Sequence, residues 1–222
     1  MKTLLVGHQF GTVDNSSASG TLSQLYAPNA NNDGGLVGEL SGGTVSYSHA
    51  TGDVYGSDAN NGGLVGRANG GNVTDSYAEG NVFGAAKDDG GLIGKQTAGT
   101  VTDTYATGTP GGGGATLGGL VADQTGGTVT SSYYDNTKDG LSGGLGTSES
   151  ATSMTQQGTF SGWNFTTVWS ISKTVNDGFP TLLPPSTPAG QVPEVPWAAA
   201  LPLVGLAGWF TLQRRRGLSQ GR

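Results

Sequence analysis

The sequence contains no cysteine and few charged residues, and both absences narrow the class of protein. Without cysteine, a disulfide framework and a cysteine-based metal site are impossible. Ten Lys and Arg residues stand against 16 Asp and Glu residues, giving a net charge of −6 and no basic patch that would predict nucleic-acid binding. At 12% charged residues, the chain also lacks the charge density that is typical of disordered polyelectrolytes.

Glycine, in contrast, is abundant, with 42 residues in a chain of 222. Each Gly in a helix interior costs about 1 kcal/mol relative to Ala, so long helices are disfavoured. The Gly residues do not follow a Gly-X-Y period, which excludes collagen. The composition therefore indicates a glycine-rich, weakly acidic β architecture or a low-complexity chain.

An internal repeat decides between these two alternatives. A GGLVG-like string recurs every 28 residues and begins at Gly34, Gly62, Gly90 and Gly118. A second string, of the form GTVTDTYATG, keeps the same phase and begins at Gly43, Gly71, Gly99 and Gly127. An irregular earlier copy extends from Leu5 to Leu22. The chain therefore contains about five units, four of them in strict register.

A unit of this length cannot bury a core alone, so neighbouring units must stack. Stacked parallel strands lie about 4.8 Å apart, so equivalent residues would form ladders. We expect a leucine ladder of Leu36, Leu64, Leu92 and Leu120. We expect a valine ladder of Val45, Val73, Val101 and Val129, and an aromatic one of His49, Tyr77, Tyr105 and Tyr133.

These ladders predict an all-β protein, a parallel β-solenoid (β-helix) of about five coils with mostly a 28-residue period. Each coil is predicted to hold two or three strands of at most four or five residues. The Gly pairs fit tight corners, where positive φ or close backbone approach is needed, and Asn or Asp precedes them as turn chemistry requires. An aromatic C-terminal cap and a short apolar C-terminal helix complete the prediction.

The repeat resembles the GLUG repeat of bacterial surface proteins and adhesins, because GGLVG is followed by GNVTDSYAEGNV. The resemblance extends from Leu5 to Leu183, since the stretch after the last repeat is similar to the segment that closes GLUG arrays. That stretch gathers the aromatic residues Phe160, Trp163, Phe165, Trp169 and Phe179. We expect it to cover the open end of the stack, where strand edges and apolar columns are exposed. The resemblance implies adhesion, with a glycan or a surface protein of a host or neighbouring cell as partner, or a spacer role.

The same interpretation divides the chain into five parts. They are a solenoid over 1–134 that is incomplete at its N-terminus, a cap over 135–183, a Pro-rich linker over 184–196, an apolar segment with an Arg cluster over 197–216, and a tail over 217–222. Met1–Val6 begins like an export signal, but Gly7 interrupts its apolar run. We therefore expect the complete protein to begin upstream.

The C-terminal part of the sequence indicates export. The uncharged run Trp197–Leu212 would reach about 24 Å as a helix, short of the roughly 30 Å hydrocarbon core. Together with Pro193, Glu194 and the cluster Arg214, Arg215 and Arg216, it resembles the PEP-CTERM sorting signal. This resemblance implies membrane attachment, processing by an exosortase-like enzyme, and a location in the cell surface, outer envelope or medium. Pro193-Glu194-Val195-Pro196 departs from a strict Pro-Glu-Pro, and a plain tail anchor without cleavage is the alternative.

Two outward surfaces are candidates for binding a ligand. Residues that flank the valine ladder should point outward and form a flat array, namely Thr44, Ser46, Asn72, Thr74, Thr100, Thr102, Thr128 and Thr130. This array is similar to the Thr-X-Thr faces of ice-binding solenoids, so ice binding is one alternative function. The residues after each GGLVG-like string should also stack, as either a solvated face or a mixed-charge ligand stripe: Glu39, Arg67, Lys95 and Asp123.

The sequence shows no arrangement typical of catalysis. Neither His8 nor His49 has a spaced partner for a metal site, and HExxH and GxSxG motifs are absent. Asp residues are plentiful, so a polysaccharide-active hydrolase or lyase with paired carboxylates is the enzyme alternative. Asp75 and Asp103 share one repeat position, however, which indicates a structural role. Calcium at the corner residues stays open, although the GGxGxDxUx pattern is missing; these residues are Asp33, Asp58, Asp88 and Asp89. We predict a protein without enzymatic activity or cofactor.

Overall fold

The computed structural model describes residues 6–23, 32–57, 59–85, 88–113, 116–137 and 145–184. All of them belong to a first compact unit, residues 1–185, and a second unit comprises residues 186–222. Nearly all of the predicted Pro-rich linker, the whole predicted apolar helix and the tail lie outside the described residues. The solenoid and the segment that follows it are described below.

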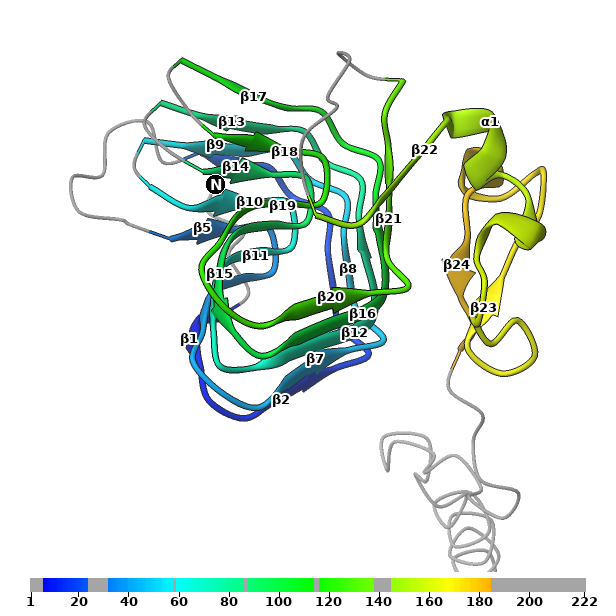
Figure 1. Ribbon diagram of the computed structural model, residues 1–222, viewed down its shortest axis with the longest axis horizontal. Helices are drawn as coiled ribbons and strands as arrows, with labels where there is room; N and C mark the ends of the chain where they lie inside the picture. The colour runs from blue at the N-terminus through cyan, green and yellow to red at the C-terminus, as the bar shows by residue number, and fades with distance from the viewer. Residues whose placement is uncertain are drawn as a thin grey trace, which may run out of the picture. The chain divides into compact units, whose positions relative to one another are not determined.

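Four parallel sheets run along the stack of coils, as predicted for a parallel β-solenoid (Figure 1). The first contains β1 (Val6–Gln9), β6 (Val37–Leu40), β11 (Val65–Asn69), β15 (Ile93–Ala98) and β19 (Val121–Gln124). The second contains β2 (Thr12–Asp14), β3 (Ser17–Ala18), β7 (Thr44–Ser46), β8 (His49–Ala50), β12 (Asn72–Ala78), β16 (Thr100–Ala106), β20 (Thr128–Thr130), β21 (Tyr133–Asp135) and β22 (Thr147–Glu149).

The two remaining solenoid sheets are shorter. The third contains β4 (Leu22–Ser23), β9 (Val54–Gly56), β13 (Val82–Gly84) and β17 (Pro110–Gly112). The fourth contains β5 (Asp33–Gly34), β10 (Asn61–Gly62), β14 (Asp89–Gly90) and β18 (Leu117–Gly118). The first sheet receives one strand from each of five coils, so the stack spans four turns.

The predicted division of each coil into two or three strands was wrong. A complete coil contributes a strand to all four sheets, and β12 and β16 each run for seven residues, beyond the predicted limit of five. In β12 and β16 a single left-handed residue, Asp75 or Asp103, bends the strand, and ladder pairing continues on both sides of the bend. In the other coils the equivalent residue lies between two shorter strands. Each coil has one left-handed residue at this bend, with φ near +50°. These residues are Asn15, Tyr47, Asp75, Asp103 and Ser131.

A buried hydroxyl group follows most of these bends. The Ser48 Oγ donates to the Ser46 carbonyl at 2.6 Å, and the Ser76 Oγ donates to the Thr74 carbonyl at 2.7 Å. Asn and Asp tolerate left-handed backbone better than most residues, because their short polar side chains bond locally. Asp75 therefore occupies a position that the bend itself explains.

The core ladders confirm the predicted register. The Leu36 amide donates to the Leu64 carbonyl at 3.0 Å, and this bond recurs in the next two coils. All four ladder leucines are fully buried, each contributing about 1.5–3 kcal/mol by leaving water. Val45, Val73 and Val101 are also fully buried, whereas Val129 of the last coil is only partly buried.

Glycine in the GGLVG string permits close approach between coils. A Cβ added at Gly63 would lie 2.1 Å from the Gly91 carbonyl oxygen and 2.9 Å from the Ala78 methyl group. The backbone of one coil therefore occupies the space that a side chain of its neighbour would need.

The segment after the coils covers the last coil in part, as predicted, but its aromatic residues cover a side of the solenoid. It contains α1 (Ala151–Met154), the 3₁₀ turns η1 (Gln157–Thr159) and η2 (Asn176–Gly178), and the antiparallel pair β23 (Trp169–Ser170) and β24 (Thr181–Leu182). Among its described residues, β22 extends the stack by pairing with β21, and Leu145 bridges Val121 of the last coil and packs against the core. The aromatic residues instead pack against Tyr77, Tyr105 and Tyr133 on the outside of the second sheet. These rings point outward because the residues that follow them, Ala78, Ala106 and Tyr134, point into the core, and the rings form an apolar side that needs covering.

Candidate functional site

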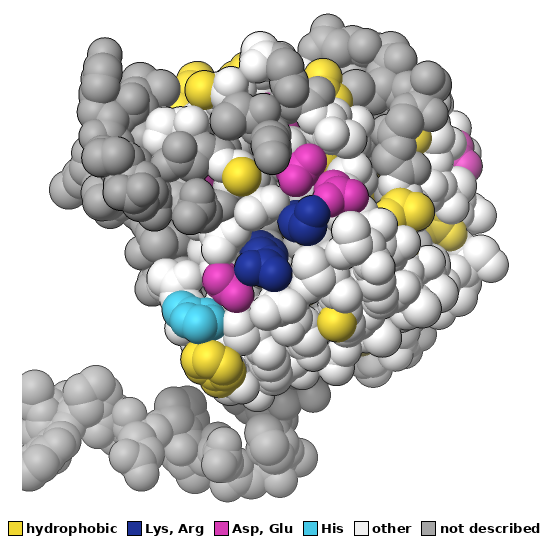
Figure 2. Space-filling view, turned by 60° about the vertical axis from the view of Figure 1, so that its left-hand side comes forward, with side chains coloured by type: hydrophobic (Ala, Val, Ile, Leu, Met, Phe, Trp, Pro, Cys, Tyr) yellow, Lys and Arg dark blue, Asp and Glu magenta, His cyan; other side chains and the backbone are white. Residues whose placement is uncertain are grey.

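One outward column of the first sheet carries charged side chains, as predicted. We call it the charged column, and its members in register are His8, Glu39, Arg67, Lys95 and Asp123. Figure 2 shows its two cationic side chains side by side, with acidic side chains at both ends. The sequence prediction missed His8 because the first coil is irregular, although VGHQ at residues 6–9 parallels VGEL at residues 37–40.

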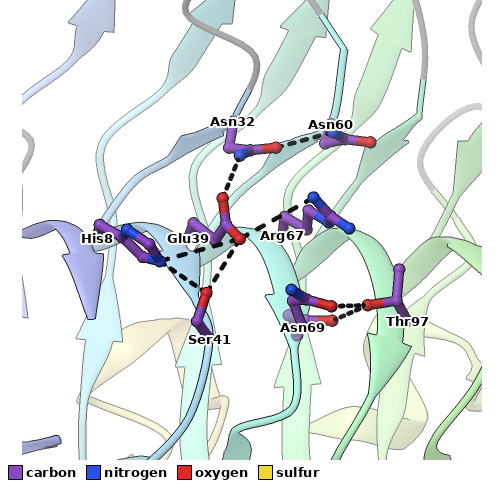
Figure 3. A network of polar contacts seen from close by, with 9 residues as sticks. His8, Asn32, Glu39, Ser41, Asn60, Arg67, Asn69 and Thr97 are labelled. Carbon is purple, nitrogen blue, oxygen red and sulfur yellow. Dashed lines mark hydrogen bonds and ion pairs between the residues drawn. The ribbon is translucent and has the colours of Figure 1, made fainter. Parts of the chain in front are cut away.

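The Glu39 carboxylate is the centre of a polar network on this column (Figure 3). It accepts hydrogen bonds from the Ser41 Oγ at 3.0 Å and from the Asn32 Nδ2 at 2.9 Å. The Arg67 Nη1 and the His8 Nε2 each lie 4.0 Å from Glu39 Oε1. Since several partners hold it, the Glu39 side chain is fixed on the surface.

The charges of the column balance one another. Arg67 pairs with Glu39, and the Lys95 Nζ donates to the Asp123 carboxylate in the next coil. These side chains remain partly exposed, between 21% and 34%. The charged column is thus a nearly neutral polar strip, which suits an uncharged polar ligand better than a strongly charged one.

The predicted Thr-rich array also forms, and we call it the hydroxyl ladder. Its members lie in register on β7, β12, β16 and β20, and they are Thr44, Ser46, Asn72, Thr74, Thr100, Thr102, Thr128 and Thr130. The Thr100 Oγ1 donates to the Asn72 Oδ1 at 2.9 Å, and the oxygens of Thr102 and Thr130 lie 3.1 Å apart. Bonds between coils therefore fix the orientation of these four side chains.

One member of the hydroxyl ladder departs from the prediction. Ser46 was expected to point to solvent, but it is only 9% exposed, and its Oγ donates to the Asp14 carboxylate at 2.7 Å. The first coil covers it, because Thr12 and Asp14 pair with Thr44 and Ser46. The sequence prediction missed this extension of the ladder, although the TVD string after Gly11 matches TVS after Gly43.

The carboxylates considered for catalysis lie at two bends of the second sheet. Burial raises the pKa of Asp75, and a hydrogen bond from Thr74 partly opposes this shift. Burial also raises the pKa of Asp103, and the charge of Asp75 raises it further. Carboxyl groups with raised pKa can serve as acids or bases. Here, however, the same bend is made by Tyr47 and Ser131 in other coils, so the backbone explains these positions.

The described residues among those considered for calcium are buried. Asp89 is fully buried, and its carboxylate accepts hydrogen bonds from the Asn61 Nδ2 at 2.7 Å and the Gly84 amide at 2.9 Å. Burial raises the pKa of Asp89. Asp33 and Asp88 are also buried, whereas Asp58 lies outside the described residues. Within the described ranges, no three His, Asp or Glu side chains gather closely enough to hold a metal ion.

The predicted sorting motif lies outside the described residues, at Pro193, Glu194, Arg214, Arg215 and Arg216. In the part of the chain that the structure describes, no helix has the length and apolar character to cross a membrane.

Comparisons with known proteins identify the repeat. The family model of the GLUG motif matches residues 29–55 and 60–82, which fall on two consecutive coils. Searches of curated proteins and of solved structures gave no match. The matched coils share their register with the coils on either side. Residues 29–55 and 60–82 are therefore GLUG repeats.

Proposed function

We propose that this protein is a non-catalytic cell-surface module that binds a neutral polysaccharide along the hydroxyl ladder and the charged column. The observation that carries this proposal is the in-register bonding of the hydroxyl ladder, seen in the Thr100–Asn72 and Thr102–Thr130 pairs. Like side chains then recur about every 4.8 Å on a fixed surface. Such a surface suits a ligand that is itself a polar repeat.

The charge distribution supports a neutral ligand. The net charge of −6 disfavours a polyanion, and the cations of the charged column already have acidic partners. The hydroxyl and amide groups of the hydroxyl ladder can both donate and accept, as sugar hydroxyl groups require.

The surface location in this proposal rests on the resemblance of residues 193–216 to a sorting signal. Mass spectrometry of the C-terminal peptide, after fractionation of native cells, tests it. Envelope or extracellular protein lacking residues after about 196 supports export and processing. Cytoplasmic protein that retains Arg222 contradicts both.

The binding proposal is tested with the full chain on an array of neutral and acidic polysaccharides. Thr102→Tyr places a bulky ring on the hydroxyl ladder, and we expect it to weaken binding at least tenfold. Thr166→Tyr, at an exposed position of the closing segment, is the matched control and should bind like the wild type. Lys95→Glu tests the charged column separately.

Two outcomes would contradict the proposal. Absence of saturable binding to every polysaccharide would leave a spacer role, and binding to cells that survives removal of glycans would indicate a protein partner. Ice binding has narrower support, because only β16 and β20 carry Thr at both outward positions. Thermal hysteresis that Thr102→Tyr abolishes would favour it.

A further inference from the structure

The outward rings of His49, Tyr77, Tyr105 and Tyr133 on the second sheet form a stack that we call the aromatic column. This column ends before the first coil. The His49 ring stacks on Tyr77 with centroids 4.8 Å apart and planes at 5°, and Tyr77 stacks on Tyr105 at 4.9 Å and 4°. In the first coil the residue paired with His49 is Ser17, which has no ring. The stack of rings therefore stops at His49, and one face of its imidazole looks toward a small side chain.

A notch of about 250 Å³ lies at this position. The first coil borders it with Asn15 and Ser17, the second coil with Tyr47 and His49, and the closing segment with Leu182 and Pro184. Ligand sites for drug-sized molecules measure about 300–1,000 Å³. A notch of this size suits one ring of a ligand whose remainder extends into solvent.

The polar groups around the notch have capacity for a ligand. Among the described residues, the Asn15 amide group and the Ser17 hydroxyl group form no hydrogen bond with another side chain. Burial lowers the pKa of His49, so its ring is neutral at pH 7 and has one donor and one acceptor nitrogen. An apolar ring face thus adjoins several uncommitted donors and acceptors.

Tyr47 provides a second, independent observation. It has φ of 46° at the bend where the other coils carry Asn15, Asp75, Asp103 and Ser131. A bulky residue in this conformation costs about 1–2 kcal/mol, and such strain gathers at functional sites. Tyr47 as a whole residue is 38% exposed, and it borders the notch. The one strained bulky residue of this bend therefore lies where a ring-shaped ligand would contact it.

We propose that this notch binds a single sugar ring of a neutral glycan, with its apolar face on His49 and its hydroxyl groups bonded to Asn15 and Ser17. The site is separate from the hydroxyl ladder and the charged column. Its ligand class is that of the proposed function, but either site can bind without the other.

The surroundings favour a sugar over other rings. An aromatic side chain would cover Asn15 and Ser17 without bonding their polar groups, which is unfavourable. An anion would find no Lys or Arg among the bordering residues, and His49 is neutral. A sugar ring has both an apolar face and a rim of hydroxyl groups, which matches both features of the notch.

The test uses the two histidines of the full chain, whose ring signals in NMR spectra report on different places. The probes are the methyl glycosides of glucose, galactose, mannose and N-acetylglucosamine, with p-cresol as an aromatic comparison. We expect at least one glycoside to shift the His49 signals saturably, with a dissociation constant on the order of 1 mM for a single ring. His8, on the charged column, should not shift.

Variants connect this shift to the notch. Ser17→Tyr adds a ring in register with His49, fills the notch, and should weaken binding at least tenfold. Ser23→Tyr, at an exposed position of the same coil, is the matched control and should bind normally. If Ser17→Tyr changes the unfolding midpoint, Asn15→Gly decides, because Gly adopts the left-handed backbone and removes only the amide group. We expect it to weaken binding at least threefold.

Three results would overturn the proposal. They are the absence of any His49 shift with the glycosides, a shift with p-cresol alone, and unchanged glycoside binding in Ser17→Tyr. Polysaccharide binding that Thr102→Tyr abolishes and Ser17→Tyr leaves intact would retain the proposed function and reject the notch. If the wild type binds no polysaccharide on the array but a glycoside shifts the His49 signals specifically, the notch would be retained and the proposed function rejected.

Discussion

The aromatic column and the charged column are built by the same repeat, yet their surroundings are opposite. Tyr105 is fully buried, and its Oη donates to the Pro180 carbonyl at 2.6 Å. Arg67 remains 34% exposed, and its closest acid, Glu39, is 4.0 Å away. Stacking fixes the register of both columns, but only the column that residues 151–183 cover excludes water.

The two columns therefore have different roles. The aromatic column, which is covered, holds the molecule together, and the charged column, which is open to solvent, presents side chains to a ligand. A covered column needs side chains that fit the covering segment, and three of its members are Tyr. The open column holds His, Glu, Arg, Lys and Asp in successive coils, since an exposed position places little demand on the fold. The repeat therefore supplies one side for holding the molecule together and another for meeting a ligand.

The largest expected effect on stability comes from a substitution in the aromatic column, which residues 151–183 cover. Tyr105→Ala removes a buried ring and should lower the free energy of unfolding by about 3–5 kcal/mol. Urea unfolding measures this, and limited proteolysis should show residues 151–183 becoming accessible. Tyr105→Phe, which removes only the hydroxyl group, should cost about 1–2 kcal/mol. Unchanged protection of residues 151–183 in Tyr105→Ala would contradict the assigned role.

A smaller effect concerns Tyr47, the exposed ring beside the covered column. Tyr47→Asn replaces a bulky residue in left-handed backbone with one that adopts this conformation more easily. We therefore expect the free energy of unfolding to rise by about 1 kcal/mol. Tyr55→Asn is the control, because Tyr55 has no positive φ and stacks on Phe83 at 5.3 Å. A loss of stability in Tyr47→Asn would show that the ring packs more tightly than its exposure indicates.

The next prediction concerns pH and the bend beside the covered column. Burial raises the pKa of Asp75 above its ordinary value of 3.8, so its ionised form destabilises the fold. Stability from this group is fully present below pH 3.8 and is lost as the pH rises through the folded pKa. Asp75→Asn should therefore be more stable than the wild type at pH 7, and the difference should narrow as the pH falls toward 3.8.

Thermal unfolding of both proteins between pH 3.5 and 7 tests this direction. The difference between them removes the contribution of His49, whose lowered pKa acts in the opposite direction below pH 6.5. A constant difference across this range would show that the Asp75 carboxyl group does not titrate differently on folding.

The smallest expected effect on stability comes from a substitution in the charged column. Arg67→Ala should change the free energy of unfolding by only about 0.5 kcal/mol, because exposed ion pairs contribute little. The change should shrink further in high salt, and chemical denaturation at two salt concentrations measures both. Lys95→Ala provides the comparison in the next coil. A loss above about 1 kcal/mol would mean that the charged column stabilises the stack.

The constant spacing made most of the fold predictable. Once units recur every 28 residues, Leu36 must lie beside Leu64 and Val45 beside Val73, and the structure confirms both pairs. The number of strands per coil was not predictable, because left-handed bends such as that at Asp103 interrupt the two-residue alternation without ending the strand. The surface covered by Trp169 depends on distant contacts that no local pattern encodes.

The candidate surfaces were predictable to the same extent. Thr102 and Thr130 lie where the repeat places them. The burial of Ser46 was not foreseen, since its partner Asp14 is 32 residues away and breaks the period. The notch has the same origin, because Ser17 is also 32 residues before His49, in the irregular coil. Features of the regular coils follow from the sequence, and features of the irregular coil require the structure.

The covering segment, residues 151–183, also limits where further coils can be added to the stack. It is hydrogen-bonded to three successive coils, through Asn176 at Glu79, Pro180 at Tyr105 and Trp163 at Ser131. A duplicated unit inserted among these coils would move one anchor by about 4.8 Å relative to the others. A duplication nearer the N-terminus would lengthen the stack and leave all three anchors in place, so gene duplication can change the length of this protein from one side alone.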